Sequence, residues 1–208
     1  ITFVDDDDYL EPDYLLSMWL SASDESVVIG LLADESLRGE REINTPNNNR
    51  VAALKGGRQP LRNRSGLLGL NACKLIPSKY AKRIKYEDSL VSGEDTVFMS
   101  QLLEFEDLTL VPCAPMAGSM YVRRMSDNSV SRQPESFDFC VTQRIAVINC
   151  LIETRNRIHK KNAGAINYLI DNQASFIRKY YSSNPSRQRE VKDFISSNCI
   201  DRKVVRLG

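Results

Sequence analysis

Four consecutive aspartates, Asp5 to Asp8, constrain the fold of this chain more than any other feature. They follow the apolar run Thr2-Phe3-Val4 and precede Pro12, which suits the first position of a helix because its missing N–H would have no helical partner. The next apolar residues repeat at helical spacing and predict a core-facing side: Tyr14, Leu15, Met18 and Trp19. We therefore expect a strand, an acidic turn at its carboxyl end, and a helix.

This acidic run has two interpretations. Carboxylates repel one another, and Asp is depleted in strands, so the run needs a compensating interaction. Asp8 and Glu11 would complement the positive end of the following helix, which explains only part of the cluster. Alternatively, the aspartates form a site for a hard cation such as Mg, Mn or Ca, which prefers oxygen ligands. The residues alone leave both interpretations open.

Composition limits the classes of function. The 208 residues can form one substantial core or one domain with an appendage, and the net charge of +1 argues against bulk binding of nucleic acid. No apolar run is as long as a membrane span. The absence of C-x-x-C pairs argues against a zinc site or a disulfide framework, and indicates reduced thiols in the cytosol. The presence of a single histidine argues against a Ser-His-Asp catalytic triad. Because the chain opens on Ile1 within an expected strand, we expect a fragment whose upstream part is missing.

The rest of the chain predicts alternating strands and helices, then helices alone. Residues 27–32 predict a second buried strand, and residues 108–111 and 120–122 predict a hairpin. The basic stretch 34–65 predicts a long loop, either solvated or acting as a lid whose arginines meet phosphate. From Ser136 onward, helical stripes predict packing faces: Val141, Ile145, Ile148 and Ile152, then Ile166, Leu169, Ile170, Gln173 and Ile177.

A second acidic pair, Glu94 and Asp95, follows Ser92-Gly93 at the start of an expected helix. Ser92 would cap this helix while the carboxylates complement its positive end, as in a capping box. Together with the upstream aspartates, the pair also has a chemical interpretation. One carboxylate site would hold a cation on a leaving diphosphate, and the other would take a proton from an attacking hydroxyl.

Five motifs occur in a distinctive order. They are Asp5-Asp6-Asp7-Asp8-Tyr9-Leu10-Glu11-Pro12, Cys73-Lys74-Leu75-Ile76, Tyr86-Glu87-Asp88, Gly93-Glu94-Asp95-Thr96-Val97-Phe98, and Tyr121-Val122-Arg123 leading to Ser129-Val130-Ser131-Arg132. This ordered set resembles the downstream part of family 2 glycosyltransferases of the GT-A fold. The resemblance implies an α/β class, with a partial GT-A sheet flanked by helices over residues 1–132 and an α-helical region over residues 133–208. The nucleotide-binding half would lie upstream, so we expect the fragment alone to be inactive.

The resemblance also implies roles for individual residues. Asp5 and Asp7 occupy the D-x-D positions and would hold Mn or Mg, while Asp5 and Asp6 would lie near the nucleotide. Asp95 would be the general base that activates the acceptor hydroxyl, and Glu94 would bind acceptor hydroxyls or orient its neighbour. Arg132, in a segment that closes over the donor, would contact its phosphates.

The implied function is metal-dependent, inverting transfer of one sugar from a nucleotide-sugar donor to a glycan or lipid-linked acceptor, in polysaccharide biosynthesis. The Q-x-x-R-W motif of processive synthases is absent, since Ile145 follows Gln143-Arg144. We expect a cytoplasmic protein with no membrane span, and peripheral contact with the inner face of the membrane stays open. Two alternatives remain: a non-catalytic assembly module that uses an exposed stripe at residues 141–152, and a cation site that serves stability only.

Overall fold

The computed structural model describes residues 1–55, 57–125 and 135–207. Within them, the strands form two four-stranded sheets. In spatial order, one sheet contains β1 (Tyr9–Leu10), β8 (Met120–Arg124), β3 (Leu31–Glu35) and β4 (Arg41–Glu42), and the other contains β5 (Gln59–Pro60), β7 (Thr109–Pro112), β2 (Ser26–Ile29) and β6 (Lys74–Leu75). The pairs β2–β7 and β3–β8 are parallel, and the other pairs are antiparallel. The prediction of a mixed α/β class is confirmed.

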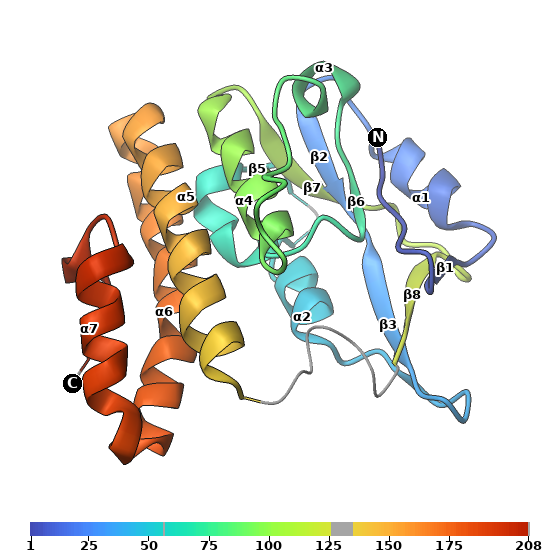
Figure 1. Ribbon diagram of the computed structural model, residues 1–208. Coiled ribbons are helices and arrows are strands. Elements are labelled where there is room, and N and C mark those ends of the chain that lie inside the picture. Colours follow the sequence, from blue (N-terminus) through green and yellow to red (C-terminus); the bar gives the residue numbers. More distant parts are fainter. Residues whose placement is uncertain (56, 126–134, 208) are drawn as a thin grey trace.

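The helices cover the sheets on two sides (Figure 1). They are α1 (Tyr14–Leu20), α2 (Pro46–Ala52), α3 (Ser78–Ala81), α4 (Glu94–Gln101), α5 (Gln143–Arg157), α6 (Ala163–Ser183) and α7 (Gln188–Asn198). Short 3-10 turns are η1 (Leu61–Leu67), η2 (Leu102–Glu104), η5 (Lys160–Asn162), η6 (Pro185–Arg187) and η7 (Arg202–Val204), and a π turn, η4 (Asp138–Thr142), precedes α5. Helices α5, α6 and α7 stack along one side, and α1 lies on the opposite side.

The predicted stripes of the C-terminal helices are confirmed as packing faces. All nine of their residues are buried, and one hydrophobic cluster runs from β2 through α4 into α5, α6 and α7. The helical region therefore shares its core with the rest of the chain. The alternative function as a non-catalytic assembly module requires an exposed apolar stripe at residues 141–152. The residues of that stripe are buried, which counts against this alternative. Among the described residues, no helix has both the length and the apolar character to cross a membrane.

The strand predicted over residues 27–32 is wrong, because the chain changes sheets at Gly30. Strand β2 ends at Ile29, and β3 starts at Leu31 in the other sheet. A Cβ atom on Gly30 would lie 2.8 Å from Cε2 of Tyr14 and 3.0 Å from Sδ of Met18. Helix α1 therefore packs directly against the backbone at this point, which only glycine permits.

The predicted hairpin is also wrong. Strand β7 pairs with β2 and strand β8 pairs with β3, so the two segments belong to different sheets. Both are parallel pairs, and the apolar residues at their centres are buried. Such apolar runs do not show from the sequence which strand each will pair with. The basic stretch 34–65 is not one long loop, since it contains β4, α2, β5 and most of η1.

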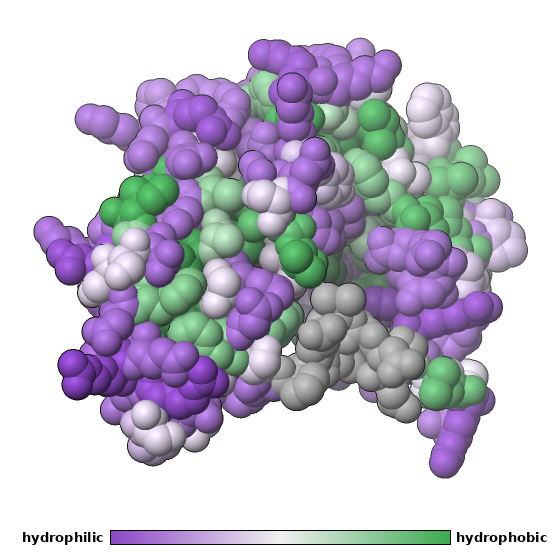
Figure 2. Space-filling model, in the orientation of Figure 1, coloured by the Kyte–Doolittle hydropathy of each residue, from purple (hydrophilic) through white to green (hydrophobic). Residues whose placement is uncertain are grey.

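The N-terminal segment departs from expectation in two ways. Residues 2–4 are not assigned to a strand, although Ile1 exchanges two backbone hydrogen bonds with Ile76, of 2.7 and 2.8 Å. In α1, Tyr14 and Met18 are buried, whereas Leu15 and Trp19 are 52% and 72% exposed. The buried face is thus narrower than the sequence suggested, and hydrophobic surface gathers over α1 (Figure 2).

Candidate active site

The aspartates form a tight turn between the N-terminal segment and β1. The backbone N–H of Asp8 donates to the carbonyl of Asp5 at 3.1 Å, and this contact closes the turn. The side chains of Asp5, Asp6 and Asp7 are exposed, and that of Asp8 is half-buried. Three carboxylates therefore face solvent while the fourth faces the protein.

The hydroxyl of Tyr121 in β8 holds this turn in place through two hydrogen bonds. This hydroxyl donates to Oδ2 of Asp8 at 2.8 Å and accepts from the backbone N–H of Asp5 at 3.1 Å. The other carboxylate oxygen of Asp8 accepts from the backbone N–H of Arg124 at 2.9 Å. Asp8 is thus a structural anchor, which leaves Asp5, Asp6 and Asp7 as the available ligands. The sequence motif contained Tyr121 but gave no sign of this role.

The second acidic pair lies at the start of α4, and Gly93 positions it. Gly93 has a φ of 88°, in the left-handed region that favours glycine, and its Cβ would lie 2.7 Å from Cγ2 of Val147 in α5. The expected Ser92 cap is wrong, because Ser92 does not cap the helix. Its hydroxyl instead accepts from the buried guanidinium of Arg144 at 2.6 Å, so α5 holds the turn in place.

Asp95 has the environment of a proton acceptor. Its pKa is raised to about 6, first because burial disfavours the charged form and then because of the charge on Glu94. A backbone hydrogen bond from Asn71 and the ammonium of Lys74 oppose this shift. The hydroxyl of Tyr86 donates to Oδ1 of Asp95 at 3.5 Å, and the amide of Asn71 donates to that hydroxyl.

The two acidic segments approach each other. The charge on Asp5 contributes to the raised pKa of Asp95. In turn, the pKa of Asp5 is raised by partial desolvation at the turn, although the residue stays exposed, and then by its aspartate neighbours and by Glu94. Phe3, just before the aspartates, packs edge-to-face on Tyr86, which precedes the pair on α4 in the sequence. Their ring centroids are 5.8 Å apart, so this contact holds the two parts of the chain together. Asp5, Glu94 and Asp95 therefore belong to one electrostatic site.

The remaining predicted site residues have less defined positions. Asp6 and Asp7 adjoin Asp5 and add to its raised pKa, and within the described residues neither forms a hydrogen bond or ion pair with the pair on α4. One oxygen of Glu94, Oε2, is buried and has no hydrogen-bond partner among the residues that the structure describes. Arg132 lies outside the described residues. Within the described ranges, no three His, Cys, Asp or Glu side chains gather closely enough to hold a metal ion by themselves.

Lys74 is a neighbour of the site to which the sequence gave no role. It is 1% exposed, and its ammonium interacts electrostatically with Asp95. A lysine within the apolar run Ala72 to Ile76 was the available signal. Burial of a cation is costly, so such a lysine is more often functional than a solvated one.

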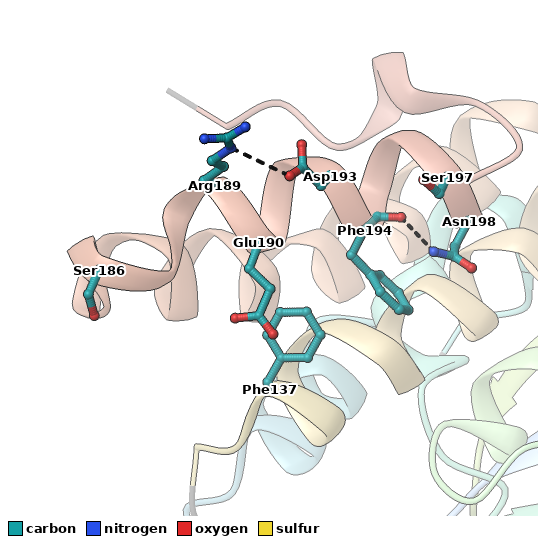
Figure 3. Close-up of a pocket in the computed structure, with 8 residues that line it drawn as sticks. All are labelled: Phe137, Ser186, Arg189, Glu190, Asp193, Phe194, Ser197 and Asn198. Atoms are coloured by element: carbon teal, nitrogen blue, oxygen red, sulfur yellow. Dashed lines mark hydrogen bonds and ion pairs between the residues drawn. The ribbon is translucent and has the colours of Figure 1, made fainter.

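One cavity in the described part of the chain lies away from these carboxylates. Its volume is about 610 Å³, and it opens on α7. Figure 3 shows Phe137 and Phe194 packed together on one wall, with the ion pair of Arg189 and Asp193 along the helix above. The lining of the cavity contains none of the predicted site residues, so this cavity is separate from the candidate active site.

No protein-family model matches this sequence, and no curated protein matches it.

Proposed function

We propose that the chain is the metal- and acceptor-binding part of an inverting GT-A glycosyltransferase, which moves one sugar from a nucleotide-sugar donor to a glycan or lipid-linked acceptor. The observation that supports the proposal is the electrostatic coupling of Asp5 to Glu94 and Asp95, about ninety positions away in the sequence, together with the packing of Phe3 on Tyr86. The raised pKa of Asp95 supports the role of general base, since proton transfer is most efficient when this pKa is near the working pH.

The side chains available as metal ligands suit a hard divalent cation. All the available ligands are carboxylate oxygens, and Mg²⁺ is usually held by one or two carboxylates together with substrate phosphates. Asp5 and Asp7 would hold Mn or Mg, Asp6 would lie near the nucleotide, and Arg132 would contact the donor phosphates. When bound, the cation would neutralise the charge that develops on the departing diphosphate.

In the proposed reaction, Asp95 takes the proton of an acceptor hydroxyl. The hydroxyl oxygen then forms a bond to the anomeric carbon of the donor sugar, on the face opposite the diphosphate. The bond between that carbon and the phosphate oxygen breaks, and the nucleoside diphosphate leaves with the electron pair. Glu94 would bind acceptor hydroxyls through Oε2, which has no hydrogen-bond partner in the described part of the chain. We place this reaction in the cytoplasm, in polysaccharide biosynthesis.

The test uses the full-length protein, because the resemblance places the nucleotide-binding strands upstream of Ile1. Nucleotide sugars are screened for manganese-dependent turnover in wild-type protein and in Asp95→Asn. We expect Asp95→Asn to lose at least a hundredfold in rate, as removal of a general base does, while donor binding survives. The control is Asp88→Asn, whose exposed carboxylate lies seven positions away in the sequence. Near-native turnover of Asp95→Asn would refute the assignment.

A further inference from the structure

A cavity of about 290 Å³ lies beside the candidate active site. Its walls come from the start of α2, from η1 and the residues that follow it, from β8 and from α6. Three cationic side chains line it, Arg50, Lys74 and Arg123, and its described lining contains no carboxylate residue. The side chains that line the cavity are therefore cationic, and the carboxylates that interact with them lie outside the lining.

Lys74 is the most unusual member of this lining. It is almost completely buried, and its Nζ donates one hydrogen bond, of 3.1 Å, to the carbonyl of Ala72. An ammonium has three donors, so two remain for a ligand. No carboxylate lies within ion-pair distance of it among the described residues, and burial lowers its pKa to about 8. Lys74 thus has no ion pair within the described residues and only a longer-range interaction with Asp95, an arrangement that a bound anion would complete.

The two arginines differ in how much of their charge is available. Arg123 forms two hydrogen bonds to the carboxylate of Asp34, of 2.8 and 3.0 Å, so most of its charge is balanced. Arg50 is exposed and has no ion pair or hydrogen bond within the part of the chain that the structure describes. A Cβ on Gly66 would lie 2.9 Å from Nε of Arg50, so this glycine leaves the space that the guanidinium uses.

The cavity adjoins the residues that we assign to proton transfer. The hydroxyl of Thr96, the residue after Asp95, donates to the carbonyl of Gly69 in the cavity wall at 3.2 Å. Lys74 interacts electrostatically with Asp95. A group bound in the cavity would therefore lie next to the place where the acceptor hydroxyl loses its proton.

We propose that this cavity binds an oxyanion, a phosphate or a carboxylate carried by the acceptor, with Lys74 at its base and Arg50 at its mouth. The claim that the cavity binds an anion depends only on the residues that line it. The claim that this anion belongs to the acceptor rests on the proposed function. The acceptor would then be an anionic glycan or a phosphate-linked lipid rather than a neutral sugar.

The test is calorimetric titration of the 208-residue chain with inorganic phosphate, glucuronate and glucose. We expect phosphate or glucuronate to bind and glucose not to bind, and the tighter anion distinguishes a phosphate-bearing acceptor from a uronic acid. Lys74→Met should weaken anion binding about tenfold or more, since it removes a charged hydrogen bond. Lys82→Met, which removes an exposed lysine, is the matched control.

Arg50→Met provides a second variant with no folding risk, because the side chain is exposed, and we expect it to weaken binding several-fold. Equal affinity of Lys74→Met and wild type, or equal affinity for glucose and the anions, would overturn the proposal. Asp95→Asn should lose sugar transfer and keep anion binding. Wild-type protein that binds the anions but transfers no sugar would refute the proposed function and leave the cavity assignment standing.

Discussion

Replacement of Asp95 by Asn should stabilise the protein at neutral and higher pH. The folded protein holds the proton of Asp95 up to a pKa of about 6, whereas the unfolded chain releases it near 3.8. The folded state therefore loses stability as the pH rises between these values, and the loss is complete above pH 6. One pKa unit corresponds to about 1.4 kcal/mol, so the full penalty is about 3 kcal/mol, and partial solvent access reduces it to roughly 1–3 kcal/mol.

Urea unfolding of wild type and Asp95→Asn at pH 4 and pH 8 measures this effect. Near pH 4 the two proteins should have similar free energies of unfolding, because Asp95 is protonated in the folded state. At pH 8 the variant should be the more stable one, by the amount above. Asp88→Asn, which replaces an exposed aspartate, is the control. A variant that is less stable than wild type at pH 8, or whose stability changes equally at both pH values, would refute the claim that burial of the charged Asp95 carboxylate destabilises the folded protein.

Two further substitutions test how the acidic segments are held. Gly93→Ala should cost roughly 2–4 kcal/mol in unfolding free energy, because alanine at a φ of 88° is strained and its Cβ would overlap Val147; shortening Val147 to Ala should restore part of this loss, and a neutral Gly93→Ala would contradict the packing. Tyr121→Phe should cost about 1–3 kcal/mol in urea unfolding, since it removes the hydroxyl that bonds Asp5 and Asp8. An unchanged unfolding midpoint in Tyr121→Phe would show that this hydroxyl does not fix the turn.

Helical periodicity was the most informative signal in the sequence. The stripes on α5 and α6 predicted both the helices and their buried faces, because a period of 3.6 residues places such residues on one side. The same signal overestimated α1, where Leu15 and Trp19 continue the apolar pattern but face solvent. Periodicity shows that an apolar stripe exists, but its width depends on what packs against it.

Features that depend on distant partners could not be predicted. The change of sheet at Gly30 follows from the approach of Tyr14 and Met18, and strand pairing joins residues 26–35 to residues 109–124. The hydroxyl of Tyr121 meets Asp5 and Asp8 across more than a hundred residues. Each of these contacts is set by the packing of the whole chain, which no local pattern encodes.

Paramagnetic broadening by Mn²⁺ tests the central claim most directly, because the claim is that two distant acidic segments form one cation-dependent site. Manganese is titrated into the isotopically labelled 208-residue chain, and the backbone amide signals are followed by NMR. Our account predicts that the signals of Asp5 to Asp7 and those of Glu94 and Asp95 broaden together at the lowest manganese concentrations. Broadening confined to one of the two segments, or spread evenly over the acidic surface, would contradict it.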